Sequence, residues 1–223
     1  MATAEQRESI VAALLALAAE RRWDEIALAD VAERAGVPLS VLRRAYDGRT
    51  AILAEFVAGI DAAVLDGRDL DMDGEPARDR VLDAVMRRLD ALAPHKPAIR
   101  GLVRSARTQP GLALALARLG LISQPWTLAS AGIEASSPMG RLRAAGLGVV
   151  MMRILPVWLD DDDPGLSRTL AALDRALTRG EETLDRVERI GCRIRRFVER
   201  ARSRRARPEE RPDGGAAADA GAV

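Results

Sequence analysis

The feature that most constrains the fold is the spacing of apolar residues in a chain built largely from Ala and Leu. Between Glu5 and Arg22, the residues Ile10, Leu14 and Leu17 recur at three- and four-residue steps, which places them on one helix face. No sustained run alternates β-branched or aromatic residues with polar ones, as a half-buried strand would. Because aromatic residues make up only 3% of the chain, Ala and Leu must supply the core. The sequence therefore predicts an all-α fold.

Gly and Pro mark where the predicted helices begin and end. Gly36 is suited to close a short helix at 28–35, because glycine adopts the left-handed conformation at little cost. Pro38 permits a new helix at 39–46, which stops at the turn signal Asp47-Gly48. Further helices are expected at 49–65, 76–92, 96–108, 111–121, 139–159, 164–178 and 181–204, with Gly180 interrupting the chain before the last of them.

The domain organisation follows from composition along the chain. The acidic, Gly-containing segment 66–75 is expected to be a solvated linker between a small N-terminal domain, residues 1–65, and a larger helical body, residues 66–180. Residues 181–204 predict a basic amphipathic helix. The final segment, 205–223, is rich in Pro, Gly, Ala and charge and is expected to be disordered.

Overall composition bears on what the protein binds and where in the cell it is located. The net charge of +1 implies no general attraction to nucleic acid, so any such attraction must be local. Cys192 is the only cysteine and cannot form an internal disulfide, and the N-terminus lacks the pattern of a secretory signal. These features favour a cytoplasmic protein. The apolar stretch 144–159 is expected to be a buried helix, because it is short for a bilayer and contains Arg153 and Pro156.

Motifs that carry catalytic or metal chemistry are missing from the sequence. There is no Gly-rich phosphate loop, no nucleophile elbow and no pair of Cys or His at metal-ligand spacing. His95, between two prolines and a lysine, is expected to be an exposed loop residue. The acidic run 160–163 is expected to end a helix and face solvent, because its carboxylates are consecutive instead of spaced as ligands. We therefore expect no enzyme activity, no cofactor and no metal site.

Two of the short helices have the spacing of a helix-turn-helix. They are joined by the tripeptide 35–37, and the second helix would enter the major groove of DNA. A small apolar core shared by the two helices is expected to contain Ile26, Val31, Ala32, Val37 and Leu42.

The runs 26–37, 42–46 and 49–53 resemble the N-terminal domain of TetR-type repressors. The resemblance implies a TetR-like fold, with a three-helix DNA-binding domain followed by a helical ligand-binding and dimerisation bundle. It also implies a homodimer that places two recognition helices about 34 Å apart on palindromic double-stranded DNA. At the start of the second helix this chain has Ala27 where the family usually has a hydroxyl. Pro38, Leu39 and Val41 replace the polar residues expected at the front of the third helix.

The predicted DNA contacts are donors that suit phosphate oxygens or base edges, namely Ser40, Arg43, Arg44, Tyr46 and Arg49. An alternative interpretation stays open, in which the arginines are ordinary surface residues and Tyr46 closes the small core.

The segments 157–164 and 169–175 are similar to the C-terminal domain of the coenzyme Q biosynthesis lipid-binding protein family, which shares the fold without binding DNA. This resemblance implies a membrane-associated accessory protein of ubiquinone biosynthesis, in which residues 181–204 contact the membrane. The apolar face would contain Leu184, Val187, Ile190, Ile194 and Phe197, with Arg186, Arg193 and Arg200 opposite. The same helix could equally pack its apolar face on its own body.

A ligand pocket is predicted within the helical body. An apolar cavity for a hydrophobic small molecule or lipid is expected to be lined by Trp126, Met151, Met152, Leu155 and Trp158. The TetR resemblance implies a four-helix dimer interface formed by the helices at 139–159 and 164–178, with a stripe made of Leu166, Leu170, Leu173 and Leu177. The leading hypothesis is a ligand-responsive DNA-binding transcriptional repressor, and the lipid-binding accessory protein is the alternative.

Overall fold

The computed structural model describes residues 2–205 and, from residue 185 onward, the side chains of Arg186 and Arg189 only. Within residues 2–205 all regular structure is helical, which confirms the all-α prediction. The α-helices are α1 (Ala4–Glu20), α2 (Leu28–Arg34), α3 (Leu39–Ala45), α4 (Arg49–Asp66), α5 (Ala77–Leu92), α6 (Lys96–Ala106), α7 (Pro110–Ser130), α8 (Pro138–Leu159) and α9 (Ser167–Arg205). Short 3-10 helices lie at η1 (Trp23–Glu25), η2 (Asp71–Gly74) and η3 (Ala93–His95).

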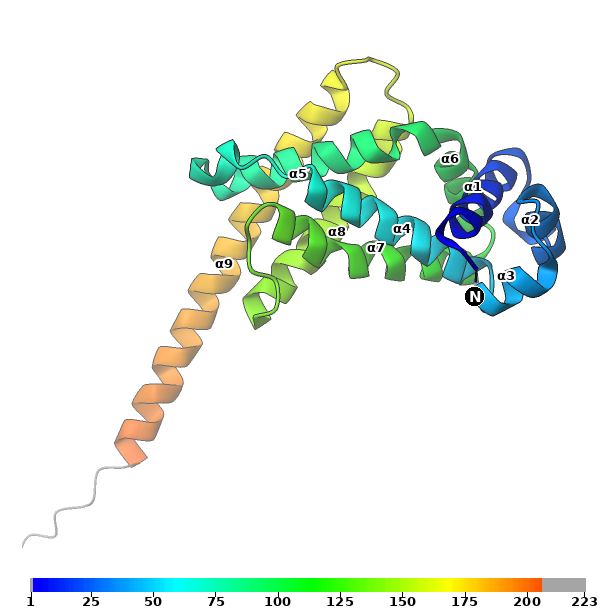
Figure 1. Ribbon diagram of the computed structural model, residues 1–223. Helices are drawn as coiled ribbons and strands as arrows, with labels where there is room; N and C mark the ends of the chain where they lie inside the picture. The colour runs from blue at the N-terminus through cyan, green and yellow to red at the C-terminus, as the bar shows by residue number, and fades with distance from the viewer. Residues whose placement is uncertain (1, 206–223) are drawn as a thin grey trace, which may run out of the picture. The chain divides into compact units, whose positions relative to one another are not determined.

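Helices α1, α2 and α3 and the first turns of α4 form the N-terminal head (Figure 1). The apolar residues predicted to join α2 to α3 behave as expected, since Ile26, Val31 and Leu42 are buried and Val37 is half-buried. Gly36 adopts φ +66° at the end of α2, the left-handed conformation that glycine favours. The sequence therefore predicted the helix-turn-helix geometry correctly.

The head shares its core with the body. The apolar cluster of the head extends to Ala98 and Leu102 on α6 and to Leu112 on α7. Residues 2–180 accordingly form one compact unit, and the described residues that follow Gly180 belong to a second. The segment 66–75, predicted as a linker, contains η2 and follows directly from α4.

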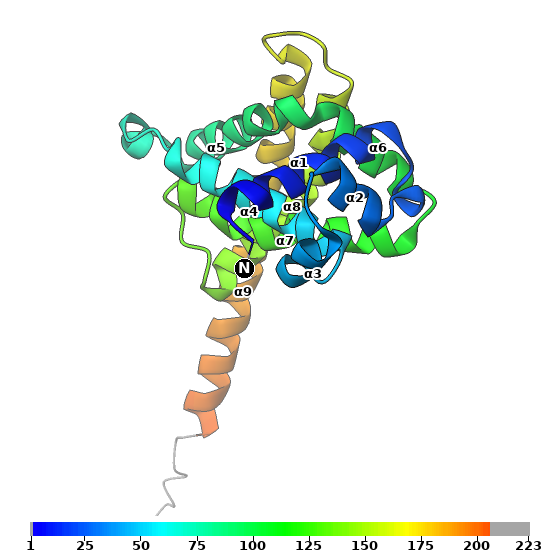
Figure 2. The same cartoon turned by 45° about the vertical axis from the view of Figure 1, so that its right-hand side comes forward.

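The body is organised around α4, which runs from the head between α5 and α7 (Figures 1 and 2). A second apolar cluster fills the space among α5, α8 and the start of α9, and it includes Val85, Leu89, Ile154, Trp158 and Leu173. The first turns of α4 belong to the head, and the rest of the helix packs in the body. One continuous helix therefore joins the two parts.

Two predicted helix boundaries are wrong. Helix α7 covers Pro110–Ser130 instead of 111–121, and it continues through Pro125. Gly180 does not interrupt the chain, because α9 runs from Ser167 to Arg205. A helical glycine costs only about 1 kcal/mol relative to alanine, so the strong helix formers on either side can carry the helix through it.

Two polar groups are more buried than predicted. His95 lies in η3 and is half-buried, with its ring 5.0 Å from that of Phe56 in an edge-on contact, and burial lowers its pKa. Asp161 is 1% exposed instead of solvated, and its carboxylate accepts hydrogen bonds from the backbone and hydroxyl of Thr169 at 2.8 and 2.7 Å. The hydroxyl bond from Thr169 contributes most to lowering the pKa of Asp161. Asp161 therefore fixes the start of α9.

Helices α7 and α8, in the part of the chain that the structure describes, are long and apolar enough to cross a membrane by length and composition alone, a test that soluble core helices also pass. The stretch 144–159 was predicted to be buried, and this holds for one face of α8 only. Leu147, Ile154 and Trp158 are buried, whereas Val149 and Met152 are exposed.

Candidate nucleic-acid interface

The second helix of the helix-turn-helix presents its polar residues to solvent. Leu42 is fully buried and anchors α3 in the head. Ser40, Arg43 and Arg44 lie on the opposite side and are exposed. Helix α3 lies at the outer edge of the head in Figure 1. The structure therefore leaves these three predicted DNA contacts accessible within residues 1–180.

Arg43 makes a salt bridge of 2.9 Å with Asp47, one helical turn later. The side chains are 70% and 93% exposed, so the pair contributes little to stability. A phosphate oxygen would compete readily with such a solvated carboxylate, because both bind the same guanidinium donors.

Tyr46 lies in the core of the head instead of on its surface. Only 5% of the residue is exposed, and Arg7 lies 5.4 Å from the centre of its ring. Burial is the largest cause that raises the pKa of Tyr46 to about 12. The position of Tyr46 agrees with the alternative interpretation that it closes the small core, and a direct DNA contact from its buried hydroxyl is not available in this conformation.

Arg49 is also turned inward. Its guanidinium donates hydrogen bonds to the carbonyl of Ile26, at 2.6 Å, and to that of Trp23, and it stacks 4.6 Å from the Trp23 ring centre. Burial lowers the pKa of Arg49. These contacts fix the start of α4 against the segment before α2, which is a positioning role that the sequence did not reveal. The prediction of Arg49 as a DNA contact is therefore not supported by its geometry.

Helix α2 begins without a side-chain cap. Ala27 occupies the N-cap position, and the Asp30 carboxylate accepts a hydrogen bond of 3.1 Å from the Ala27 backbone N–H. This is half of a reciprocal capping box, in which a hydroxyl at the first position would also accept a bond from the third residue of the helix.

Replacing Ala27 with Ser is expected to stabilise the protein by about 1 kcal/mol, because the new hydroxyl completes the capping box. Urea unfolding followed by circular dichroism measures this change. Ala77→Ser is a suitable control, since Ala77 lies inside the first turn of α5 and not at its N-cap. Equal effects of the two substitutions would contradict the capping argument.

A buried polar cluster joins three helices of the body. The Arg88 guanidinium on α5 donates to the Asp61 carboxylate on α4 and, at 3.2 Å, to the Thr127 hydroxyl on α7. The Ser123 hydroxyl, also on α7, donates to the same Asp61 oxygen at 2.5 Å. All four residues are at most 8% exposed. The cluster fixes α4 between its neighbours, and no periodicity in the sequence predicted it.

The residues predicted to line a ligand pocket do not surround one enclosed space. Trp126 and Met152 are 52% and 61% exposed, Met151 and Leu155 are half-buried, and Trp158 is fully buried. The prediction therefore fails for Trp126 and Met152, because they face away from the core. Trp158 keeps an indole N–H that is buried without a hydrogen-bond partner.

The four leucines predicted to form a dimer interface, at and just before the start of α9, do not share one exposed face. Leu173 and Leu177 are 0% and 9% exposed and pack in the core of their own chain, and Leu166 is half-buried. Of the four leucines only Leu170 is exposed. The apolar face predicted for residues 181–204 lies outside the described side chains, except for the half-buried Leu184, and the tail at 206–223 lies outside the described residues.

No family model matches the sequence, and no curated protein matches it. Solved structures do match. A TetR transcriptional regulator from Nitrosomonas europaea is 22% identical, with a TM-score of 0.61, and the match covers 78% of this chain and 97% of that one. A TetR-family transcriptional regulator from Streptomyces coelicolor is 17% identical, with a TM-score of 0.55, and the match covers 95% and 94%.

A third match is a TetR transcriptional regulator from Rhodococcus sp. RHA1, which is 18% identical with a TM-score of 0.53, and the match covers 79% of this chain and 95% of that one. At these identities the likeness concerns the fold alone. The chain has a TetR-like, all-α fold.

Proposed function

We propose that the protein is a cytoplasmic, ligand-responsive transcriptional repressor that binds double-stranded DNA as a homodimer. The observation that carries the proposal is the second helix of the helix-turn-helix, anchored by buried Leu42 and presenting Ser40, Arg43 and Arg44 to solvent. Guanidinium and hydroxyl donors on such a helix suit the phosphates and base edges of a major groove.

In this proposal the dimer forms through the outward apolar residues of α8 and α9, with Leu142, Val149, Met152 and Leu170 as its exposed contacts. A hydrophobic ligand in the body would contact Met151, Leu155 and Trp158, and the unpartnered indole N–H of Trp158 offers it a donor. Ligand occupancy would change how α4 packs and so change the separation of the two heads.

DNA binding is tested by fluorescence anisotropy with duplexes that flank the protein's own gene, over a series of salt concentrations. We expect specific binding whose affinity falls as salt rises, because phosphate contacts release counterions. Binding of flanking and scrambled duplexes with the same affinity at every salt concentration would contradict the proposal.

Replacing both Arg43 and Arg44 with Ala is expected to weaken binding by about tenfold or more and to reduce the salt slope by roughly one to two units, if each arginine neutralises one phosphate. Arg107→Ala is the matched control, because Arg107 is an exposed arginine at the end of α6. An unchanged affinity and salt slope in the double variant would remove α3 from the interface.

The second candidate is a lipid-binding, membrane-associated accessory protein of ubiquinone biosynthesis. One observation favours it, namely that α7 and α8 contain no acidic residue and expose apolar side chains, among them Leu114, Trp126 and Met152. Co-sedimentation with anionic liposomes, lost on deletion of residues 181–223, is the expected result for that function. Liposome binding without specific DNA binding would favour this candidate over the regulator.

A further inference from the structure

Helix α7 turns several polar residues inward and several apolar residues outward, whereas Leu112 and Leu128 are buried in the usual way. Ser123, Gln124 and Thr127 are at most 2% exposed and face α4 and its neighbours. Leu114, Ile122 and Trp126 are 72%, 55% and 52% exposed. A surface helix of a soluble protein normally shows the opposite arrangement, so this outward face is expected to be covered by something else.

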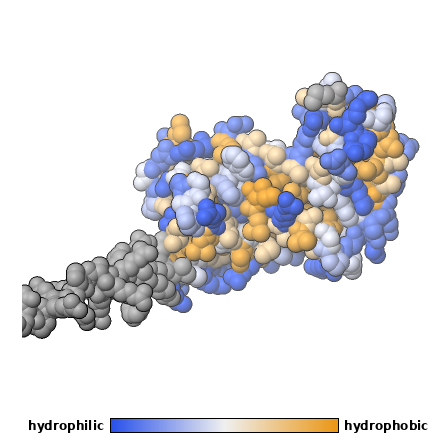
Figure 3. Space-filling view, turned by 90° about the horizontal axis from the view of Figure 1, so that it is seen from below, coloured by the Kyte–Doolittle hydropathy of each residue, from blue (hydrophilic) through white to orange (hydrophobic). Residues whose placement is uncertain are grey.

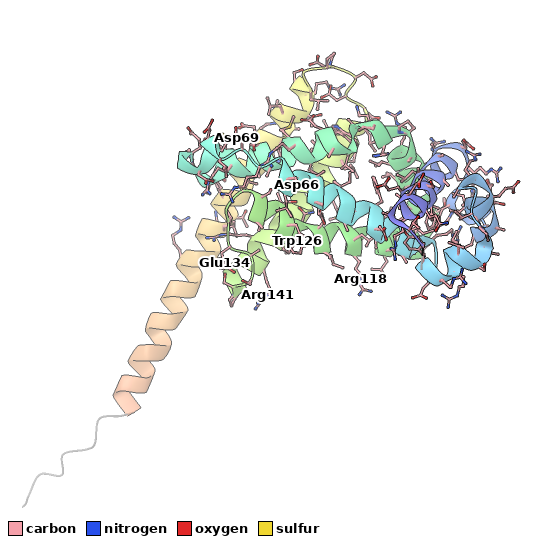
Figure 4. All side chains as sticks on the ribbon, viewed as in Figure 1. Asp66, Asp69, Arg118, Trp126, Glu134 and Arg141 are labelled. Carbon is pink, nitrogen blue, oxygen red and sulfur yellow. The ribbon has the colours of Figure 1, made fainter. Side chains whose placement is uncertain are left out.

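The outward residues form one continuous ridge. Leu114, Arg118, Ile122 and Trp126 follow one another at intervals of four residues and are all exposed. We call these four residues the α7 ridge. Arg118 is the only charged residue between 110 and 130, and within the described part of the chain it has no carboxylate partner. Arg118 and Trp126 are labelled on α7 in Figure 4. Apolar side chains gather on the face seen from below in Figure 3.

The order of residues along the ridge is complementary to itself. Arg118 lies four residues before Ile122, and Trp126 lies four residues after it. If two copies of α7 pair in antiparallel orientation about a twofold axis at Ile122, each Arg118 meets the Trp126 of the other copy. Two identical contacts of this kind define an isologous interface. An arginine over a tryptophan ring is a favourable cation–π pair, and such a pair strengthens when it is desolvated.

The packing geometry suits this pairing. Ridges made of residues four apart interdigitate when two helices cross at about 50°. Each ridge then lies in the groove beside the other, with the two Ile122 side chains at the centre. Gly111 and Gly120 of α7 also leave room for a second helix, because no atom lies within 4 Å of the position where a Cβ would project from either glycine. A lipid surface would accept the apolar residues but would leave the symmetric spacing of Arg118 and Trp126 without a role.

We propose that the α7 ridge binds the α7 ridge of a second copy of this chain, in antiparallel orientation, with reciprocal contacts between Arg118 and Trp126. This surface is separate from the α8 and α9 face assigned to the regulatory dimer, and a chain that used both surfaces would assemble beyond a dimer. The inference does not depend on DNA binding.

Cysteine cross-linking tests the pairing and its direction. In full-length protein carrying Cys192→Ser, Ile122→Cys is expected to form a disulfide-linked dimer under mild oxidation, because the two residues meet at the axis. Leu114→Cys is expected not to cross-link, since in antiparallel helices the two positions are about 20 Å apart. Leu114 is the more exposed of the two, so cross-linking by random collision would favour it and would overturn the proposal. Cross-linking of both would indicate a parallel pair and also overturn it.

The fluorescence of Trp126 provides a measurement without cysteines. Trp23 and Trp158 are buried, so Trp126 is the one exposed tryptophan among the three. Its quenching by acrylamide is expected to fall as protein concentration rises. Arg118→Glu is expected to raise the protein concentration at which Trp126 becomes protected by about tenfold or more, since two contacts are lost. Arg107→Glu is expected to leave that concentration unchanged.

Three outcomes of the fluorescence experiment would overturn the proposal. Strong quenching that does not change over the concentration range would mean that the ridge stays free. Weak quenching at every concentration that Arg118→Glu leaves unchanged would mean that the chain covers its own ridge. Protection that requires anionic vesicles instead of protein would assign the ridge to a lipid surface.

Discussion

Replacing Asp61 with Ala is expected to lower the free energy of unfolding by about 3–5 kcal/mol, because it leaves the Arg88 charge buried without its carboxylate. Arg88 is 5% exposed and its remaining described partner is the hydroxyl of Thr127. The Ser123 hydroxyl would lose its acceptor as well. A loss of this size is a large part of the stability of a typical domain, so the variant is expected to unfold at markedly lower urea concentration.

Two further variants separate the effect of burial from that of charge pairing. Asp83→Ala removes a carboxylate that pairs with Arg87 at 2.9 Å on α5, where the two side chains are only half-buried, and it should cost less than Asp61→Ala because the remaining Arg87 charge still reaches solvent. The double variant Asp61→Leu with Arg88→Met removes both charges and should be more stable than Asp61→Ala, because buried ion pairs are often replaceable by apolar residues. If Asp61→Ala unfolds no more easily than Asp83→Ala, the cluster does not fix α4.

The sequence predicted the head better than the body, for a physical reason. In the head, apolar residues at helical spacing and the left-handed Gly36 agree with each other, so local signals and tertiary packing point to the same structure. The body departs from this rule at α7. There, the inward residues Ser123 and Thr127 are polar because they satisfy Asp61 and Arg88, which lie on other helices and far away in the sequence. A periodicity analysis treats such residues as a solvent face.

For the candidate interface, too, only part of the geometry could be predicted from the sequence. Exposure of Arg43 and Arg44 follows from the buried position of Leu42 on a short amphipathic helix, so it could be predicted from spacing. The inward turn of Arg49 could not, because its hydrogen bonds go to backbone carbonyls whose positions depend on how α4 packs. Tyr46 was open to both interpretations, and only the packing of Arg7 and the core around it decides that it is buried.

Gly101→Ala is expected to destabilise the protein strongly, because α1 and α6 approach each other too closely at this point to admit a side chain. A Cβ built on Gly101 would lie 1.9 Å from the backbone oxygen of Ala18 and 3.0 Å from its carbonyl carbon. Both partners are backbone atoms of helices, so no flexible side chain can move aside. The two helices must separate, which exposes apolar contacts around Leu102 and disturbs the hydrogen bond of 3.1 Å from the Trp23 backbone to Ser105.

We expect Gly101→Ala to lower the free energy of unfolding by about 3 kcal/mol, at the upper end of the range for overpacked sites. Gly120→Ala is the control, because nothing lies within 4 Å of its Cβ position on α7, and alanine there should be neutral or stabilising by up to about 1 kcal/mol. Hydrogen exchange of the α1 amides adds a local measurement, since α1 packs on α6 and should open more often when the two helices are forced apart. If Gly101→Ala matches Gly120→Ala in both measurements, the head is not held to the body through this contact.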